Sequence, residues 1–167
     1  MSGREKMWKL SAFIRMLGNR NIHKFNPDDF ISRLRLQKYV YLAKFFDIDL
    51  GYKYNLYLRG PYSPTLAEDY YKLSEERLAG AMFREMANFD DFADLVRGKD
   101  HKWLEIATTI IFIFENNVRK EWLNEDELKA FVINRTSDIK SRTGRPYVKR
   151  VFKELEHAGL LKLVSNS

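Results

Sequence analysis

Residues Arg33–Ala43 read RLRLQKYVYLA and lie within a longer segment, residues 30–46, that is apolar around most of its circumference. At helical spacing Leu34, Tyr41 and Phe45 share one side, while the narrower polar stripe carries Arg33, Gln37 and Lys44. This distribution predicts a helix that is buried on more than one side. Asp28, in the preceding Asn-Pro-Asp loop, is expected to cap the start of the helix.

A second stretch, Tyr54–Pro64, reads YNLYLRGPYSP and predicts a strand that is followed at once by a helix. From Tyr54 to Leu58, three apolar positions alternate with two others, which is typical of a short strand. Gly60-Pro61 is expected to turn the chain. Ser63 can then cap the next helix, with Pro64 at its first position, where the missing amide hydrogen costs little. Together the two stretches predict a helix, strand and helix arrangement.

Three further segments complete the N-terminal and central parts of the chain. An amphipathic helix is expected to end near Gly18, residues 75–98 are expected to hold one or two helices, and Trp103–Phe114 predicts a second helix that is apolar nearly all round. Arg97-Gly98-Lys99 is the best candidate boundary. We therefore divide the chain into an N-terminal helical part, residues 1–98, and a C-terminal part, residues 99–167, that together form one compact unit.

The C-terminal part has the element order of a winged-helix or helix-turn-helix unit. Asn124, with Glu127 three residues later, forms a capping-box pattern that predicts a helix start. A polar loop at residues 136–144, a last helix from Pro146 to Gly159 and a short strand at residues 160–164 are expected to follow. The predicted fold class is mainly α with a few short β-strands, a winged-helix-like helical domain.

Composition indicates the cellular location of this protein and the chemistry that is open to it. The chain has 167 residues, is 45% hydrophobic and has no cysteine, so it can build a core without disulfides, and it cannot use a thiolate as nucleophile or zinc ligand. Its longest apolar run, Ile106–Phe114, is much shorter than the roughly 20 residues of a membrane span. The N-terminus lacks the pattern of a secretory signal. We expect a cytoplasmic protein with no membrane partner.

Charge is distributed unevenly around a net value of +6. Residues 1–60 carry 12 basic and 5 acidic side chains, residues 61–101 carry 5 and 9, and residues 102–167 carry 12 and 9. Basic flanks around an acidic middle are compatible with duplex nucleic acid or with an acidic protein partner. The sequence does not indicate the oligomeric state.

The most basic segment surrounds the start of the last predicted helix. Between residues 134 and 153 seven basic side chains stand against Asp138 alone. On the helix, the apolar residues from Val148 to Leu155 fall on one face and the basic residues on the opposite face. The nucleic-acid contacts expected from this pattern are Arg142, Arg145, Lys149, Arg150 and Lys153. The alternative interpretation is the ordinary solvated face of an amphipathic surface helix.

A second candidate surface combines tyrosine with basic side chains in residues 35–62. Tyrosine and arginine anchor many protein interfaces, so this surface would suit a protein partner. The contacts expected there are Arg35, Lys38, Arg59 and Tyr62. The alternative is that most of these tyrosines pack in the core with a hydrated hydroxyl end.

Enzymatic chemistry finds little support in the sequence. His23, His101 and His157 have no metal-ligand spacing, and no glycine-rich phosphate loop or nucleophile elbow occurs. We therefore expect no cofactor, no metal and no catalytic residue. The leading hypothesis is a non-enzymatic regulatory protein that binds nucleic acid, and the runner-up is a protein-interaction module of antitoxin or adaptor type.

Several motifs resemble a known family. Leu36-Gln-Lys-Tyr-Val-Tyr-Leu42, the turn Gly60-Pro-Tyr-Ser63, the helix Lys102-Trp-Leu-Glu-Ile-Ala-Thr108 and the closing segment Val151–Leu160 are similar, in this order, to the YwgA-like proteins and the related Panacea domain of SocA-type antitoxins. The resemblance covers most of residues 30–161, except the segment 75–98. It implies a compact, mainly helical fold with winged-helix character that serves regulation or antitoxin-like partner binding, and it implies no catalytic residues.

Overall fold

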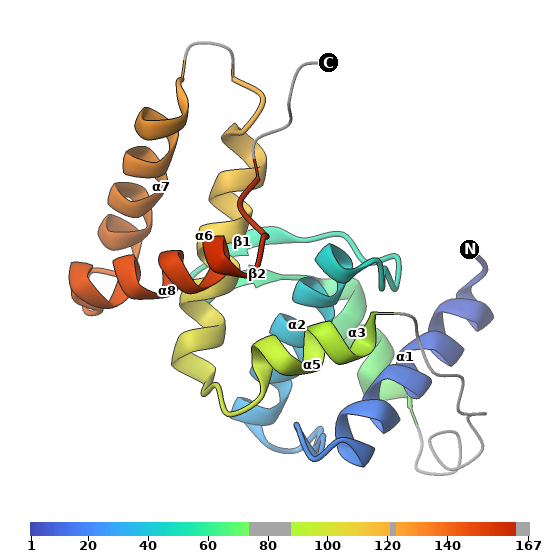
Figure 1. The fold of residues 1–167 in the computed structure, drawn as a ribbon. Helices are drawn as coiled ribbons and strands as arrows, with labels where there is room; N and C mark the ends of the chain where they lie inside the picture. The colour runs from blue at the N-terminus through green and yellow to red at the C-terminus, as the bar shows by residue number, and fades with distance from the viewer. Residues whose placement is uncertain (74–87, 121–122, 163–167) are drawn as a thin grey trace.

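The fold is mainly helical, with one small sheet of two antiparallel strands (Figure 1). It is known from a computed structural model, which describes residues 1–73, 88–120 and 123–162. The predicted fold class, mainly α with a few short strands, is confirmed in these residues. Of the predicted helical segment 75–98, the part up to residue 87 lies outside the described residues.

Two helices and a short 3-10 turn open the chain. Helix α1 spans Gly3–Asn19, α2 spans Phe30–Ala43, and the 3-10 helix η1 spans Lys44–Phe46. The predicted cap of α2 was one residue off, because the carboxylate of Asp29, and not that of Asp28, accepts the amide of Ser32 at 2.8 Å. Ten of the helix's residues are buried, as expected for a helix covered on more than one side.

The strand after α2 folds back on itself before the next helix begins. Strand β1, Asn55–Tyr57, pairs with β2, Gly60–Tyr62, so the turn lies at residues 58–59 and the expectation that Gly60-Pro61 turns the chain was wrong. Gly60 has φ +92°, and an added Cβ would lie 3.0 Å from Thr109 Oγ1. Glycine is therefore needed where β2 approaches helix α6, His101–Asn117, and not in the turn itself.

The hairpin leads directly into α3, Pro64–Lys72. The hydroxyl of Ser63 accepts the amide of Leu66, and Pro64 occupies the start of the helix, so the predicted cap is confirmed. After the segment outside the described residues, α5 spans Phe89–Val96 and presents Phe89 and Phe92 to the core.

The described residues of the C-terminal part form three helices: α6, His101–Asn117; α7, Glu125–Ile139; and α8, Arg145–His157. The capping box of Asn124 and Glu127 is present. Because α7 continues to Ile139, the connection to α8 is shorter than the loop predicted at residues 136–144. Residues 160–162 form no strand, and the rest of the predicted strand lies outside the described residues.

Helix α6 joins the two parts of the chain. It contacts α2 and β2 on one side and α7 and α8 on the other, and α8 crosses it in Figure 1. Buried residues from both parts belong to a single hydrophobic cluster. Eleven residues of α6 are buried, in agreement with its nearly all-round apolar sequence. The helix therefore fixes the hairpin and α8 in relation to each other.

Candidate nucleic-acid interface and a buried lysine network

Helix α8 has one buried apolar face and one exposed basic face. Its buried residues are Val148, Val151, Phe152 and Leu155. On the opposite side Lys149, Arg150 and Lys153 are all exposed. The helix thus docks on α6 and α7 while it holds three cationic side chains in water.

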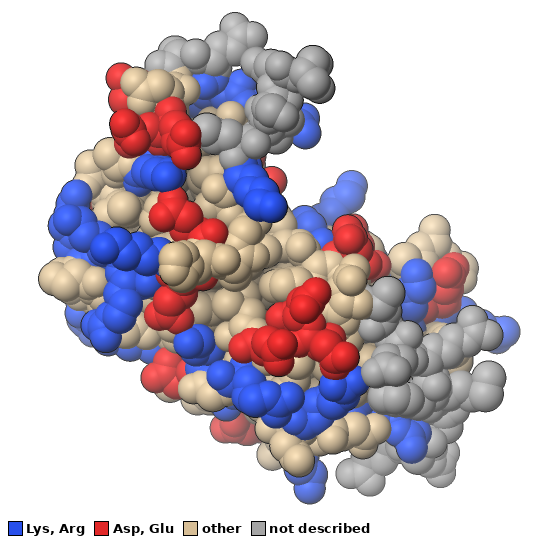
Figure 2. Space-filling model, in the orientation of Figure 1, with Lys and Arg blue, Asp and Glu red and all other residues tan. Residues whose placement is uncertain are grey.

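The carboxylates of α8 do not neutralise this basic face. Glu154 accepts a 2.8 Å hydrogen bond from the ammonium of Lys99, and Glu156 lies 2.6 Å from that of Lys129 on α7. Lys149 and Lys153 form no ion pair with any carboxylate in the described part of the chain. Figure 2 shows Lys and Arg side chains gathered where α7 meets α8 in Figure 1.

The loop and the first turn of α8 extend the basic face. Arg142 is exposed in the loop, and Arg145, the first residue of α8, donates a hydrogen bond to the side-chain oxygen of Asn134. No side chain caps the helix, because the N-cap residue is Gly144. The structure therefore brings all five predicted contacts to one end and one side of α8, with Arg145 tethered to α7.

Tyr147 is held between two cations on this surface. The ammonium of Lys102 lies 4.6 Å from the centroid of the ring, and the guanidinium carbon of Arg150 lies 5.4 Å from it. Sequence reasoning missed Lys102, which belongs to α6 and is far from the basic segment along the chain. Only the packing of α8 against α6 places it there.

The second predicted surface is only partly present. Lys38 is 1% exposed, so its prediction as a partner contact was wrong. Arg35 is half-buried and donates a 2.6 Å hydrogen bond to the hydroxyl of Tyr39. Arg59 is exposed, and half-buried Tyr62 packs against Tyr57 with the ring centroids 5.5 Å apart.

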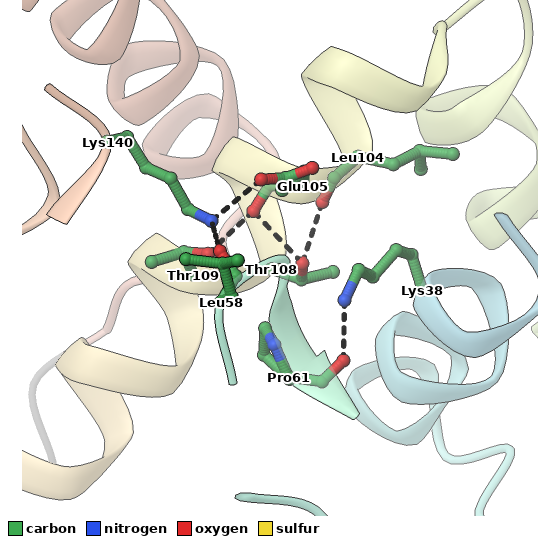
Figure 3. A network of polar contacts seen from close by, with 8 residues as sticks. All are labelled: Lys38, Leu58, Pro61, Leu104, Glu105, Thr108, Thr109 and Lys140. Carbon is green, nitrogen blue, oxygen red and sulfur yellow. Dashed lines mark hydrogen bonds and ion pairs between the residues drawn. The ribbon is translucent and has the colours of Figure 1, made fainter. Parts of the chain in front are cut away.

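Lys38 instead belongs to a buried polar network beneath the hairpin (Figure 3). Its ammonium donates a 2.6 Å hydrogen bond to the carbonyl of Pro61. From the other side of the network, Lys140 donates to the carbonyl of Leu58 and to the carboxylate of Glu105, both at 2.7 Å. Two lysines from distant helical segments therefore hold the hairpin by its backbone.

Burial of the two lysine side chains disfavours their charged ammonium forms. Burial lowers the pKa of Lys38 to about 7, with the positive charge of Lys140 acting in the same direction and the carboxylate of Glu105 opposing it. Lys140 is 8% exposed and has a direct carboxylate partner, whereas Lys38 bonds to a carbonyl. Lys38 is thus the less compensated of the two charges.

His23 makes a separate polar contact in the N-terminal part of the chain. His23 bonds through Nε2 to the hydroxyl of Ser32 at 2.9 Å, and burial is the main cause that lowers its pKa to about 4. No group of three His, Asp or Glu side chains that could hold a metal ion occurs in the described residues. None of the helices in the described ranges combines the length and the hydrophobicity of a membrane span.

Comparison with known proteins adds no relative. No family model, curated protein or solved structure matches the chain. The resemblance to YwgA-like proteins therefore stays a prediction from the sequence motifs, and the contacts described above carry the functional argument.

Proposed function

We propose that this is a cytoplasmic, non-enzymatic regulatory protein that binds duplex nucleic acid through the basic face of α8. The observation that carries the proposal is that Lys149, Arg150 and Lys153 are exposed on a docked helix whose own two carboxylates are occupied by other lysines. The winged-helix-like order of α7 and α8 and the resemblance to the YwgA-like family are compatible with this role.

The chemistry favours contacts with phosphate over the reading of bases. Exposed ammonium and guanidinium groups neutralise phosphates and release condensed counterions, which gives binding that is sensitive to salt. The loop before α8 adds the hydroxyls of Ser141 and Thr143 as further hydrogen-bond donors to phosphate. The basic face carries no Asn or Gln, so base-specific contacts would depend on its arginines.

Fluorescence-anisotropy titration of random duplex DNA across a salt series tests the proposal. Five phosphate contacts, one for each predicted residue, give a slope of about −4.5 in a plot of log affinity against log salt. Replacing Lys149, Arg150 and Lys153 by glutamine should reduce the magnitude of this slope by about 2.7, since three contacts are lost.

A matched control separates the α8 face from net charge. Lys24, Lys53 and Lys72 are also exposed, and their triple replacement by glutamine lowers the net charge by the same amount. The control variant should bind duplex DNA like the wild-type protein. Equal losses in the two variants, or no binding by the wild-type protein at low salt, would refute α8 as the interface.

A further inference from the structure

The protein leaves several large hydrophobic side chains in water, and they are concentrated at one place. Of the six that are exposed among the described residues, four lie on α2, the hairpin and α3: Phe30 at 49%, Tyr57 at 47%, Leu58 at 89% and Tyr71 at 59%. The other two, Met1 and Trp8, belong to the N-terminal segment. Clustered exposed apolar groups mark interaction sites more often than scattered ones do.

Two arginines lie over two of these rings, and one of the arginines directly follows the other two exposed side chains in the chain. The guanidinium of Arg59 lies 5.1 Å from the ring centroid of Phe30, and that of Arg33 lies 5.8 Å from Phe30 and 5.9 Å from Tyr71. Tyr57 and Leu58 directly precede Arg59 at the hairpin turn. We call these six residues, Phe30, Arg33, Tyr57, Leu58, Arg59 and Tyr71, the aromatic–arginine surface.

The aromatic–arginine surface is held in place by contacts to the backbone. Lys140 bonds to the carbonyl of Leu58 at 2.7 Å, which fixes the hairpin turn. Arg33 donates a 2.8 Å hydrogen bond to the carbonyl of Pro27, which fixes its guanidinium between the two rings. A surface that is already ordered loses little conformational entropy when a partner binds.

The charges on this surface are unmatched. Neither Arg33 nor Arg59 forms an ion pair with a carboxylate in the described parts of the chain. A guanidinium that lies over a ring keeps outward N–H groups, which bind carboxylates in pairs of hydrogen bonds. Among the described residues, these two guanidinium groups are therefore not paired with a carboxylate.

Two features favour a polypeptide over single-stranded nucleic acid. Bases bind proteins by stacking on free aromatic faces, but guanidinium groups already lie over Phe30 and Tyr71. Leu58, the most exposed of the large hydrophobic side chains among the described residues, is aliphatic and cannot stack, whereas it can be buried against an apolar side chain. Arginine and tyrosine are enriched at the energetic centre of protein interfaces.

We propose that the aromatic–arginine surface docks an acidic segment of another protein that carries apolar side chains between its carboxylates. Carboxylates of the segment bind Arg33 and Arg59, and its apolar side chains cover Leu58 and the exposed rings. This partner site uses other residues than the nucleic-acid face of α8, so either function can fail while the other holds.

Nuclear magnetic resonance titration of the full chain, labelled with nitrogen-15, tests the proposal. The probe is a short synthetic peptide of alternating glutamate and leucine, and the matched peptide has glutamine in place of each glutamate. The acidic peptide should shift the amide signals of Phe30, Leu58 and Arg59 saturably, and the matched peptide should bind about tenfold more weakly, as expected when charge-assisted hydrogen bonds are lost.

Two pairs of variants make the test specific. Arg59→Gln should lower the affinity for the acidic peptide about tenfold. Arg4→Gln, which removes an exposed charge on α1, should leave this affinity unchanged. Phe30→Ser should weaken binding, and Trp8→Ser, which removes another exposed ring, should not.

Three results would overturn the proposal. The first is the absence of shifts at millimolar acidic peptide, and the second is equal binding of the two peptides. The third is a shift of the same amide signals by a short single-stranded oligothymidine but not by the acidic peptide. That result would assign the surface to nucleic acid. The amide spectrum of each variant also shows directly whether it is folded.

Discussion

Replacing Lys38 by methionine should remove a pH dependence of folding stability that the wild-type protein shows in mildly alkaline solution. Burial lowers the pKa of Lys38 to about 7 in the folded protein, whereas its ordinary value is 10.5. Between these two values the unfolded chain binds a proton that the folded protein lacks. The free energy of unfolding therefore rises with pH in this window, and below about pH 7 the contribution of Lys38 is constant.

The size of the change in the free energy of unfolding follows from the single proton that Lys38 binds in the unfolded chain. A group that is protonated only in the unfolded state changes the free energy of unfolding by about 1.4 kcal/mol for each pH unit. From about pH 7.5 to pH 9.5 the wild-type protein should gain about 3 kcal/mol from Lys38. Methionine has a similar length and no charge, so Lys38→Met should show almost none of this gain. The carbonyl of Pro61 also loses its donor in the variant, and this separate contribution of about 1–3 kcal/mol does not depend on pH, so it leaves the flat pH profile of the variant unchanged.

The pH window avoids the other shifted groups. His23, with a pKa of about 4, affects stability only below its ordinary value of 6.5. Burial raises the pKa of Tyr41 and Tyr52, so these tyrosines lower stability only as pH rises through and beyond about 10, where the unfolded chain loses their protons.

Urea denaturation, followed by circular dichroism at several pH values, measures the effect. Lys53→Met is the control, because Lys53 is exposed and its replacement should leave the wild-type slope intact. If the wild-type protein and Lys38→Met gained the same stability between the two ends of the window, the buried ammonium could not be the cause and the argument would be wrong.

Three further predictions can be tested by urea denaturation. Lys140→Met should cost about 3–5 kcal/mol, because it leaves the carboxylate of Glu105 without its partner, and adding Glu105→Gln should recover part of this loss. Gly60→Ala should cost about 1–3 kcal/mol, because φ is +92° and the new methyl group would be crowded. Gly98→Ala, at φ +75° in open space, should cost less, and an equal cost would contradict the role of crowding. Asn124→Ala should cost about 1 kcal/mol through the lost cap, and no change would contradict the capping box.

Local chemistry made much of the fold predictable. The caps at Ser63 and Asn124 act within three residues of the chain, so the residues that interact are visible together in the sequence. The nearly all-round apolar sequence of α6 likewise predicts burial without reference to a neighbour. Elements whose ends and environment depend on adjacent residues could therefore be predicted well.

The errors arise where a distant part of the chain decides the outcome. Lys38 can be buried because the carbonyl of Pro61, 23 residues away in the chain, accepts its hydrogen bond. The residues next to Lys38 in the sequence do not indicate this acceptor. Gly60 is required by the approach of Thr109, so its place in a strand could not be seen from the Gly-Pro pair. The same reason hid Lys102, which reaches Tyr147 only through the packing of α6 and α8.

The bond from Lys140 to Leu58 also has a consequence for synthesis of the protein. The two residues are 82 positions apart, so the hairpin leaves the ribosome long before its lysine is made. During this interval the carbonyl of Leu58 lacks the lysine donor that holds it in the finished protein. Closing so long a loop is slow compared with local helix formation. Nascent chains that end before Lys140 should therefore have a hairpin more accessible to protease than the finished protein does.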